Sequence, residues 1–475
     1  MLCGIDLGTS SLKCTLFADN GQPLGSGRSP VSLRRDDSSG AALSDPAEWE
    51  RACALAIADA FRLSGQSPGD VDAVAVSGNG PTLVAVDASG RPVGGALSWL
   101  DRRAVGQAER ISAAAGRAVD PSFYLPKALS VLEGPDGRTV TRFFSGPEYL
   151  AYRLGADACS YLPDPYYETY VWDVATAQKL GLSAALFPPY VGPGQRIGRV
   201  GDLQAAAFGL KRGTPIASAY PDFLAALLGS GSVEPGIACD RSGSSEALNL
   251  CASGPCPDQR LFSLPHAVPG LWNLSGGLST SGAALAWFAK TFGYADAQAI
   301  RDDVSAGEPG ARGLSFLPYL AGERAPLWNP DLRASFHGVS LGHERRDFAR
   351  AAVEALAYGL RVAADIMREN GNSISAIRCS GGAATDSALC GIKADVLGVP
   401  VETLQVPDCE TLGDACAASV ALGRHSGVAE ASADMVRIGF RHAPNPSKAA
   451  AYEGAYARWK AALDSSLALP PTERR

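Results

Sequence analysis

Two distant stretches of the chain repeat the same order of features, and this repeat limits the possible folds more than any other feature of the sequence. Residues 3–17, CGIDLGTSSLKCTLF, and residues 238–251, ACDRSGSSEALNLC, each give an apolar strand with an Asp, a turn of small residues and a second apolar strand. The copies lie too far apart for a solenoid repeat. The pattern therefore predicts two related α/β domains, each beginning with a hairpin.

The rest of the chain supports this α/β class, because strand patterns alternate with helix patterns. In the first half, residues 45–65 have apolar spacing near 3.6 behind an Asp-Pro start, which predicts a helix, and residues 71–78 predict a buried strand. Residues 87–101 predict a turn and a strand, whereas residues 105–200 give no clear assignment. The second half predicts helices over 279–293, 345–370 and 412–423, a strand–turn–helix–strand unit over 376–401, and an amphipathic helix over 446–465.

The length of 475 residues exceeds that of one ordinary core, so two or three domains are expected. With 46% hydrophobic and 19% charged residues, the composition is globular. We expect an N-terminal domain over 1–231, a C-terminal domain over 232–445, and a C-terminal segment over 446–475 whose helix packs back on the body.

Charge and cysteine usage restrict the location and the partners. The net charge of −7 gives no basic field for nucleic acid or for an anionic membrane. None of the eleven cysteines forms a CxxC pair, which is typical of reduced thiols in a cytoplasm. We find neither a signal peptide at the N-terminus nor an apolar stretch of spanning length. The expected location is cytoplasmic.

Three small-residue turns follow apolar strands and could receive phosphate groups: Gly8-Thr9-Ser10-Ser11, Gly243-Ser244-Ser245 and Gly381-Gly382. Phosphates need converging backbone N–H groups with no Cβ in the way. The chain has neither a GxxxxGK[ST] motif nor a GxGxxG motif after the first strand, which argues against P-loop and Rossmann sites. One such turn is weak evidence, but three in two duplicated domains favour a nucleotide between the domains.

Asp222 is the one charged residue in IASAYPDFLAALLGSG, residues 216–231, and it has two interpretations. After Pro221 it suits the first turn of a helix, where an acidic side chain complements the helix dipole. Alternatively it is a general base at the mouth of a cleft, held by the apolar helix behind it. The window alone favours the helix start.

Four segments together resemble the FGGY carbohydrate kinases. DLGTSSLK (6–13) matches the first phosphate motif of that family, DxGTxxxK, and Trp99, Asp101 and Arg103 match its W-x-D-x-R element. Residues 334–354 fit the C-terminal signature at every position, and SGGAATDSALCGIKADVLGVPV is similar to the adenosine segment. The resemblance covers residues 2–423.

The resemblance implies two actin-like, ribonuclease H-like domains around a central cleft, with the sugar mostly on the first domain and ATP with Mg²⁺ mostly on the second. It also implies that Asp222 is the general base. Asp6 would hold Mg²⁺, and the turn with Gly8, Thr9, Ser10 and Lys13 would meet the transferred phosphoryl group. The remaining nucleotide contacts that it implies are Gly243, Ser244, Gly282, Gly382 and Asp386.

Several of these assignments have structural alternatives. Asp6 also suits a turn cap, Lys13 a solvated strand position, and Gly282 close helix packing. Asp386 stands where the family often has an amide, so its contact with adenosine is less clearly implied. Arg102 also suits a surface ion pair.

The acceptor side departs from two familiar patterns of the family. Residues 78–81, Gly-Asn-Gly-Pro, have neither the Met-His pair of xylulokinase-like members nor the Arg-Glu pair of glycerol-kinase-like members, and Phe223 follows the base where a small residue or Asn is usual. A polyhydroxy substrate needs a partner for each hydroxyl, so the substrate differs from D-xylulose and glycerol unless other residues compensate. The candidate contacts are Asn79, Gly80, Asp101, Arg102, Tyr220 and Asp222.

The sequence therefore predicts ATP-dependent phosphorylation of a small sugar or polyol, with a ketopentose-type, xylulokinase-like substrate. Two other functions remain open. One is an actin-like nucleotide-binding switch, and the other is a sugar-sensing relative without turnover. A homodimer is common among similar enzymes, but no feature of the sequence requires one.

Overall fold

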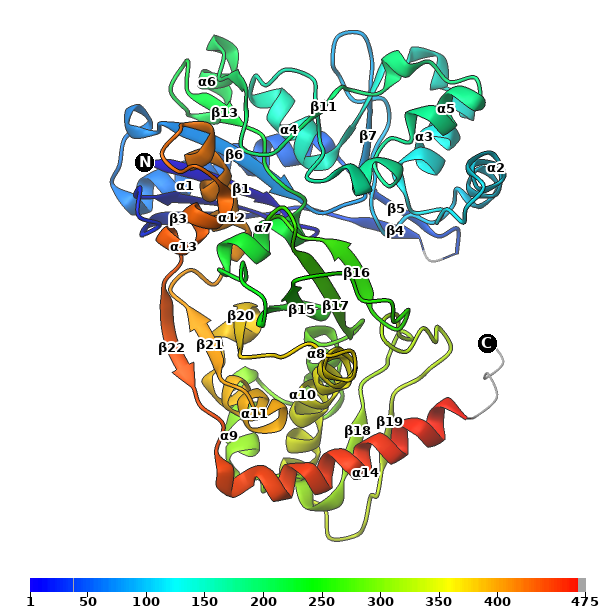
Figure 1. Ribbon diagram of the computed structural model, residues 1–475, viewed down its shortest axis with the longest axis vertical. Coiled ribbons are helices and arrows are strands. Elements are labelled where there is room, and N and C mark those ends of the chain that lie inside the picture. The colour runs from blue at the N-terminus through cyan, green and yellow to red at the C-terminus, as the bar shows by residue number, and fades with distance from the viewer. Residues whose placement is uncertain (37, 469–475) are drawn as a thin grey trace. The chain divides into compact units, whose positions relative to one another are not determined.

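The structure, a computed structural model, describes residues 1–36 and 38–468, and its chain divides into two units (Figure 1). The first unit combines Met1–Gly229 with Cys409–Val436. The second combines Ser230–Asp408 with the chain from Arg437 onward. The chain therefore leaves the first unit, returns to it for 28 residues that form two helices, and leaves again.

The first unit is built on a six-stranded sheet in which β1 and β2 form the predicted hairpin. In β1, every residue is buried, and it pairs antiparallel with β2 and parallel with β6. The strand order is β12 (Arg196–Arg199), β13 (Pro215–Ala217), β6 (Ala73–Gly78), β1 (Leu2–Leu7), β2 (Ser11–Phe17) and β3 (Pro23–Pro30). Because β1, β6 and β13 run parallel, the loops that follow these three strands leave the sheet at one edge.

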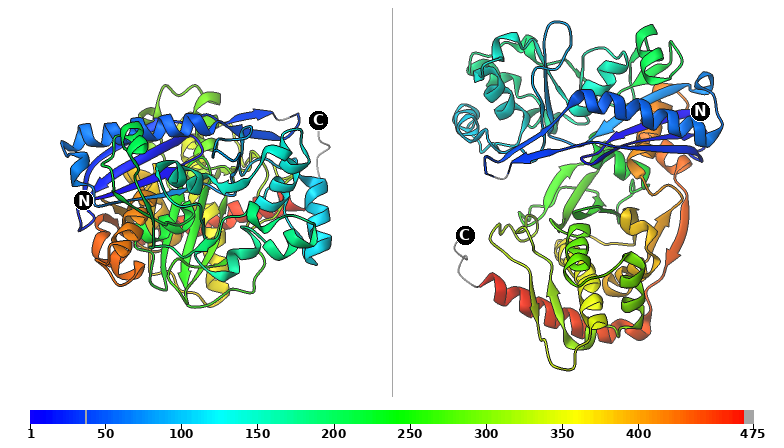
Figure 2. Two further views of the ribbon diagram at one scale, coloured as in Figure 1. Left: turned by 90° about the horizontal axis from the view of Figure 1, so that it is seen from above. Right: turned by 180° about the vertical axis from the view of Figure 1, so that it is seen from behind.

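Helices cover both faces of this sheet. Helix α1 (Pro46–Ser64) lies across β2 and β3 (Figure 2), while α12 (Cys409–Ala421) lies on β1 and β6 and packs against α7 (Asp222–Gly229). The start of α1 follows from its sequence: the Asp45 carboxylate accepts from the N–H of Ala47 at 2.9 Å, and Pro46 occupies the first turn. The helix predicted over 45–65 is confirmed.

A second sheet and the remaining helices complete the first unit. The sheet has the order β4 (Arg34–Asp36), β5 (Ala41–Ser44), β8 (Ala96–Leu97), β7 (Leu83–Val86) and β9 (Arg142–Ser145), and a separate pair joins β10 (Ser160–Tyr161) to β11 (Tyr190–Val191). The helices are α2 (Val105–Ala115), α3 (Tyr124–Glu133), α4 (Gly146–Leu154), α5 (Val174–Lys179), α6 (Asp202–Phe208) and α13 (Val428–Met435). Most of these short elements lie in the region that the sequence did not resolve.

The second unit repeats the same plan around a seven-stranded sheet. Strand β14 pairs antiparallel with β15 and parallel with β20, and β20 is parallel to β21. The order is β16 (Phe262–Pro265), β17 (Trp272–Leu278), β15 (Glu246–Ala252), β14 (Ile237–Ser242), β20 (Ala376–Gly381), β21 (Val401–Leu404) and β22 (Ile438–His442). A separate pair joins β18 (Ser315–Leu317) to β19 (Ser335–His337).

All but one of the helices that the structure describes in the second unit match predicted ones; the exception is α9 (Ala297–Ala306), which was not predicted. The helices are α8 (Gly282–Thr291), α9, α10 (Arg345–Glu369), α11 (Ser387–Leu397) and α14 (Ala449–Leu467). Helix α14, predicted over 446–465, packs on β18 and α11 of this unit, where Trp459 donates to the carbonyl of Phe316 at 2.7 Å (Figure 1). The last seven residues of the expected 446–475 segment lie outside the described residues.

The unit boundaries differ from the expected ones in one important respect. The first boundary, after Gly229, is two residues from the expected one, but residues 409–436 belong to the first unit and not to the second. Small residues explain this close packing: a Cβ on Gly4 would lie 2.0 Å from the carbonyl oxygen of Thr411, and a Cβ on Gly413 would lie 2.0 Å from that of Ala225. Helix α12, predicted over 412–423, thus covers β1 and β6 of the first sheet.

Within the described residues, we find no helix that is both long enough and apolar enough to cross a membrane. All eleven cysteines lie among the described residues, and each is buried as a free thiol.

Candidate active site

In the first unit, most of the predicted catalytic residues follow the parallel strands at one edge of the sheet. The turn at residues 8–10 follows β1, the loop at 79–81 follows β6, and Asp222 lies a few residues after β13. Pro221 forms an isolated parallel bridge with Gly78, which brings the start of α7 next to the end of β6. Loop segments at the carboxyl ends of parallel strands are the usual place for ligands in α/β folds.

The β1–β2 turn leaves a hydroxyl group ready to donate. The N–H of Gly8 donates to the carbonyl of Ser11 at 3.1 Å and closes the turn. The indole N–H of Trp99 donates to Thr9 Oγ1 at 3.1 Å, so the hydroxyl hydrogen of Thr9 stays available for another acceptor. Ser10 is exposed at the tip of the turn.

Asp6 lies in an acidic cluster around Lys13. The two residues face each other in the β1–β2 register, with Lys13 Nζ 3.6 Å from Asp6 Oδ2 and 3.9 Å from Glu410 Oε2. Thus Lys13 points toward Asp6 and not into solvent. Asp414, one turn along α12 from Glu410, is fully buried and accepts from the hydroxyl of Ser77 at 2.8 Å. Burial raises the pKa of Asp414 well above its usual range against the effect of the Ser77 hydrogen bond, and the charge of Asp6 adds to this.

The donor set around Asp6 fits a cation that keeps most of its water and phosphate ligands. Within the described residues, no group of three or more His, Cys, Asp and Glu side chains is placed to hold a metal ion. Mg²⁺ beside a nucleotide needs only one or two carboxylates, because phosphate oxygens and water complete its octahedron. Asp6 is buried at 3% exposure and has the hard oxygen ligands that this ion prefers.

Asp222 is the first residue of α7. This position is compatible both with a helix-start residue and with a general base. The Oδ1 atom of Asp222 accepts from the N–H of Phe223 at 2.6 Å, and the side chain is half-buried. Burial raises the pKa of the Tyr124 hydroxyl, and the charges of Glu148 and Asp222 add to this shift. Phe223 places its ring edge-on to Tyr167, with centroids 6.4 Å apart.

The loop after β6 is held by its own side chains. Asn79 donates from Nδ2 to the carbonyl of Leu7 at 2.9 Å, and its Oδ1 accepts from the hydroxyl of Thr82 at 2.6 Å. A Cβ on Gly80 would lie 2.8 Å from the hydroxyl oxygen of Tyr124, so glycine leaves room for that ring. Both ends of the Asn79 side chain therefore hold the loop in place.

Three further acceptor candidates contact protein groups. Asp101 is buried and accepts from the guanidinium of Arg103, at 2.7 Å for the shortest contact, and from the N–H of Ala42 at 3.1 Å. Arg102 forms the surface ion pair that was its alternative interpretation, 2.9 Å from Asp120. Tyr220 is buried, which raises the pKa of its hydroxyl, and Cys416 of α12 adds to that shift.

In the second unit, the β14–β15 turn packs against the start of α8. The N–H of Gly282 donates to the carbonyl of Gly243 at 3.1 Å, and the N–H groups of Ser281 and Ala283 donate to the carbonyl of Ser244. A Cβ on Gly282 would lie 2.4 Å from the oxygen of Gly243, so this glycine permits the close contact between turn and helix. Ser244 is exposed at the tip of the turn, as Ser10 is in the first unit.

The predicted adenosine segment borders an apolar pocket. Gly381 has a φ of +76°, and a Cβ there would lie 2.1 Å from the carbonyl oxygen of Ser242, whereas a Cβ on Gly382 would meet nothing within 4 Å. Asp386 caps α11 by accepting from the N–H groups of Ala388 and Leu389, both at 3.1 Å. The pocket has a volume of about 270 Å³, and its walls include Leu285, Ala286 and Ala289 of α8, Ala388 and Leu389 of α11, and Asp386.

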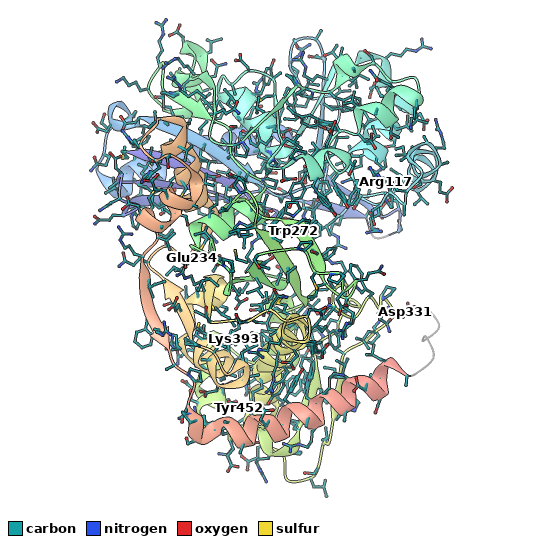
Figure 3. All side chains as sticks on the ribbon, viewed as in Figure 1. Arg117, Glu234, Trp272, Asp331, Lys393 and Tyr452 are labelled. Carbon is teal, nitrogen blue, oxygen red and sulfur yellow. The ribbon has the colours of Figure 1, made fainter. Side chains whose placement is uncertain are left out.

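A buried charged cluster supports this pocket and the neighbouring turn. Lys393 of α11, labelled in Figure 3, has no exposed surface, and its ammonium contacts Asp240 at 2.5 Å and also Glu246. Glu246 in turn accepts from the hydroxyl of Ser281 at 2.7 Å, at the start of α8. The cluster thus joins α11, the β14–β15 hairpin and α8, which carry the predicted nucleotide contacts of this unit.

Asp414, Tyr124 and Lys393 were not among the residues predicted from the sequence. One of them left a signal of the kind that drew attention to Asp222, since Asp414 is the one charged residue in LGDACAASVALG, whereas Asp395 stands close to Lys393 in CGIKADVLG. A lone charge in an apolar helix must be paired or neutralised, and it is therefore worth tracing to its partner.

Comparison with known proteins places this chain in a family. Two family models match: the FGGY family of carbohydrate kinases, N-terminal domain, over residues 1–121, and the C-terminal domain over residues 241–422. Together they cover more than half of the chain. The chain belongs to the FGGY family of carbohydrate kinases, so the predicted family and the prediction of a kinase are confirmed.

Individual relatives agree with this assignment. The xylulose kinase of Staphylococcus epidermidis is 29% identical over 481 residues, covering 97% of this chain and 96% of that protein. The ligand-bound xylulose kinase from Lactobacillus acidophilus has a TM-score of 0.84 at 23% identity, with 98% of both chains covered. The glycerol kinase of Plasmodium falciparum with ADP has a TM-score of 0.82 at 18% identity, covering 99% of this chain and 98% of that one. The predicted α/β class with actin-like domains is confirmed.

Proposed function

We propose that this kinase uses ATP and Mg²⁺ to phosphorylate a hydroxyl group of a small sugar or polyol, with a ketopentose-type substrate as the leading candidate. The observation that carries the proposal is the placement of Asp222 beside the end of β6, near the Asp6 and Thr9 turn in the same unit. The relative of 29% identity is a xylulose kinase, which supports the ketopentose class. The eleven buried free thiols support a cytoplasmic location.

The second unit would hold the nucleotide. The apolar pocket at α8 and α11 suits a heteroaromatic base, with Asp386 at its border and open space above Gly382 for the ribose. Gly243 and Ser244 would receive the phosphates at the exposed turn. Asp6 would hold Mg²⁺ when the nucleotide is bound, and this ion would neutralise charge on the phosphate oxygens.

The first unit would supply the groups that act on the acceptor and on the transferred group. Phosphoryl transfer requires mainly position and charge stabilisation. Asp222 would accept the proton of the attacking hydroxyl. The free hydroxyl hydrogen of Thr9 and the exposed Ser10 would donate to phosphoryl oxygens, with the positive charge of Lys13 close by.

Fewer of the predicted side chains are available to contact the acceptor than the sequence suggested. Asn79 and Asp101 are held by protein groups, and Arg102 pairs with Asp120, so the acceptor would meet mainly Asp222 and the backbone of the 79–81 loop. A ketopentose bound there would find partners for its remaining hydroxyl groups among backbone N–H and C=O groups.

The test is ADP release in a coupled assay against ketopentoses, ketohexoses, aldoses and polyols, with Asp222→Asn and a matched variant beside the wild type. Asp202 is a suitable control, because it also stands in the first turn of a short helix and is exposed. We expect Asp222→Asn to lower kcat by about 10²–10⁴-fold while ATP binding is retained, and Asp202→Asn to keep full turnover.

The same assay separates the alternatives. If Asp222→Asn retains turnover, the residue serves only the helix start and the proposed base is refuted. If no acceptor stimulates ADP release although ATP binds, the chain acts as a sensor or a switch and the proposed reaction is refuted. If Asp222→Asn and Asp202→Asn lower the free energy of unfolding equally, the interaction of the carboxylate with the helix dipole contributes equally to stability at the two positions.

A further inference from the structure

Lys127 is a buried cation that lies outside the site described above. It stands on α3 and has no exposed surface. Its ammonium donates to two backbone carbonyls, those of Pro81 at 2.8 Å and Ser98 at 2.7 Å. A buried lysine held by carbonyl groups is unusual, because burial disfavours the charged form unless the surroundings supply partners.

The two carbonyls belong to separate segments that both lead to the candidate site. Pro81 lies in the loop after β6, between Gly80 and Thr82, and Ser98 immediately precedes Trp99. The segments also meet at Thr82, whose Oγ1 accepts from the N–H of Trp99 at 3.3 Å. Lys127, on α3, therefore hydrogen-bonds to the same two segments that Thr82 and Trp99 join.

A continuous series of hydrogen bonds connects these segments to the turn at residues 8–10, which would meet the transferred phosphoryl group. From Thr82 it passes to Asn79 at 2.6 Å and from Asn79 to the carbonyl of Leu7 at 2.9 Å, at the end of β1. On the other side, Trp99 donates from its indole to Thr9 at 3.1 Å. A displacement at the two carbonyls would reach both the 79–81 loop and the hydroxyl of Thr9.

We propose that Lys127 is a positioning residue that holds the 79–82 loop and the 98–99 segment together. It thereby fixes the position of the 79–81 loop, which would contact the acceptor, and the orientation of the Thr9 hydroxyl. This inference rests on the proposed function for its effect on catalysis. Its structural part, the linkage of two segments by one ammonium, does not depend on which acceptor is used.

The charge of Lys127 responds to pH near neutrality. Burial lowers the pKa of Lys127 to about 7, Asp101 and Asp120 oppose this, and Arg102 adds to it. Of the elements packed on α3, β7 carries only apolar residues, α2 carries Glu109 and Arg110, which pairs with Glu133, and the turn Gly137–Thr139 carries Arg138. The neutral amine keeps two N–H donors, so its contacts weaken above this pH but are not lost.

The variant Lys127→Met tests the proposal, with Lys179→Met as the matched control. Lys179 is an exposed lysine of the same unit that also donates to a backbone carbonyl, that of Ala114 at 3.4 Å. For Lys127→Met we expect kcat/KM for the acceptor to fall about 10–100-fold while KM for ATP stays within about two-fold, because the predicted adenosine contacts, Gly282, Gly382 and Asp386, lie on the other unit. Lys179→Met should match the wild type.

A pH profile distinguishes positioning from general loss of structure. In the wild type, KM for the acceptor should rise between pH 6 and pH 8 as the ammonium loses its proton, whereas Lys127→Met should show no such rise. An unchanged kcat/KM for the acceptor in the variant refutes the proposal. So does a parallel loss of ATP and acceptor binding together with a lower Tm.

Amide hydrogen exchange provides a readout that needs no acceptor. Peptides covering 79–84 and 96–101 should exchange faster in Lys127→Met, while peptides covering the β14–β15 hairpin should be unchanged. Faster exchange without any acceptor turnover would support the linkage and refute the proposed function alone. Unchanged exchange at both segments refutes the linkage, whatever the activity.

Discussion

Asp101 and Arg102 are neighbours in the chain, but the structure holds them very differently. The Asp101 carboxylate is buried, and the hydrogen bonds from Arg103 and from the N–H of Ala42 outweigh burial, so its pKa lies below the usual value. Arg102 is 61% exposed at the surface. A buried carboxylate with several donors contributes much more to stability than a surface ion pair does.

We therefore expect Asp101→Asn to lower the free energy of unfolding by about 2 kcal/mol and Arg102→Ala to change it by less than about 0.5 kcal/mol. Urea denaturation of both variants measures this. Because the folded pKa of Asp101 is depressed, its contribution is present above pH ~4 and is lost as the pH falls further, so the Asn variant should approach the wild type in acid.

Kinetics of the same two variants decide whether either side chain contacts the acceptor. For Arg102→Ala we expect the acceptor KM to stay within about two-fold of the wild-type value, since its guanidinium pairs with Asp120. A ten-fold rise in the acceptor KM of Arg102→Ala would show that Arg102 contacts the substrate.

How far the sequence could predict individual site residues depended on whether the partner was close in the chain. The contact between Asp6 and Lys13 could have been derived from the sequence, because a tight hairpin places the two residues opposite each other. The partners of Ser77 and Lys393 are 337 and 153 residues away, respectively, and no local pattern identifies such pairs. The intramolecular contacts of Asn79 and Asp101 were also hidden, because they depend on how loops meet.

The β14–β15 hairpin, α8 and α11 meet at one buried charged cluster in which one ammonium faces two carboxylates. Burial and the charge of Asp240 raise the pKa of Glu246, Lys393 opposes both, and the resulting pKa is about 7. A carboxyl group with a raised folded pKa gives its full stability below its unfolded pKa of ~4.3 and loses it as the pH rises through about 7.

We expect Glu246→Gln, which resembles the protonated acid, to change Tm in a pH-dependent way. The Tm of the variant relative to the wild type should be higher at pH 8 than at pH 5, by a few degrees. The control is Glu453→Gln, which removes an exposed carboxylate that pairs with Arg361 on the same unit. If the difference between variant and wild type is the same at both pH values, the cluster does not titrate in this range.

The elements that the sequence predicted well are those with strong local signals. Asp45-Pro46 and Gly65 mark the two ends of α1, and residues 345–369 form the long amphipathic helix expected there. The region from 105 to 200 stayed unassigned because its strands are short, such as Ser160–Tyr161 and Tyr190–Val191, and its helices are brief. Their stability comes from packing around residues such as Trp172 and Phe143, which periodicity cannot show.

The course of the chain between the two units is the largest difference from expectation. Sequence periodicity identified α12 and its small residues, but it could not show which sheet the helix covers. The end of the first segment and the start of the returning one meet: a Cβ on Gly229 would lie 1.8 Å from the carbonyl oxygen of Cys409. Residues 230–408 are thus inserted into the first unit at a single point, and the chain from Arg437 onward joins the second unit by a separate connection.

We expect residues 1–231 alone not to fold, because they lack α12 and leave the buried face of β1 and β6 uncovered. Residues 1–229 joined to 409–436 by a short Gly/Ser linker should instead fold, because the two ends already meet. Circular dichroism and urea denaturation of the two chains measure this, with a cooperative transition expected only for the joined chain. Cooperative folding of residues 1–231 alone would contradict the importance of α12.

The insertion also affects how the protein is made on the ribosome. After Gly229 emerges, the first sheet has to wait for residues 230–408 to be synthesised before α12 can cover it. At about 5–20 residues per second, that delay is on the order of 10–40 s, far longer than helix or hairpin formation takes. Throughout this interval the nascent chain presents an uncovered apolar sheet, so its yield in the cell should depend on chaperones that bind such surfaces before the last helices arrive.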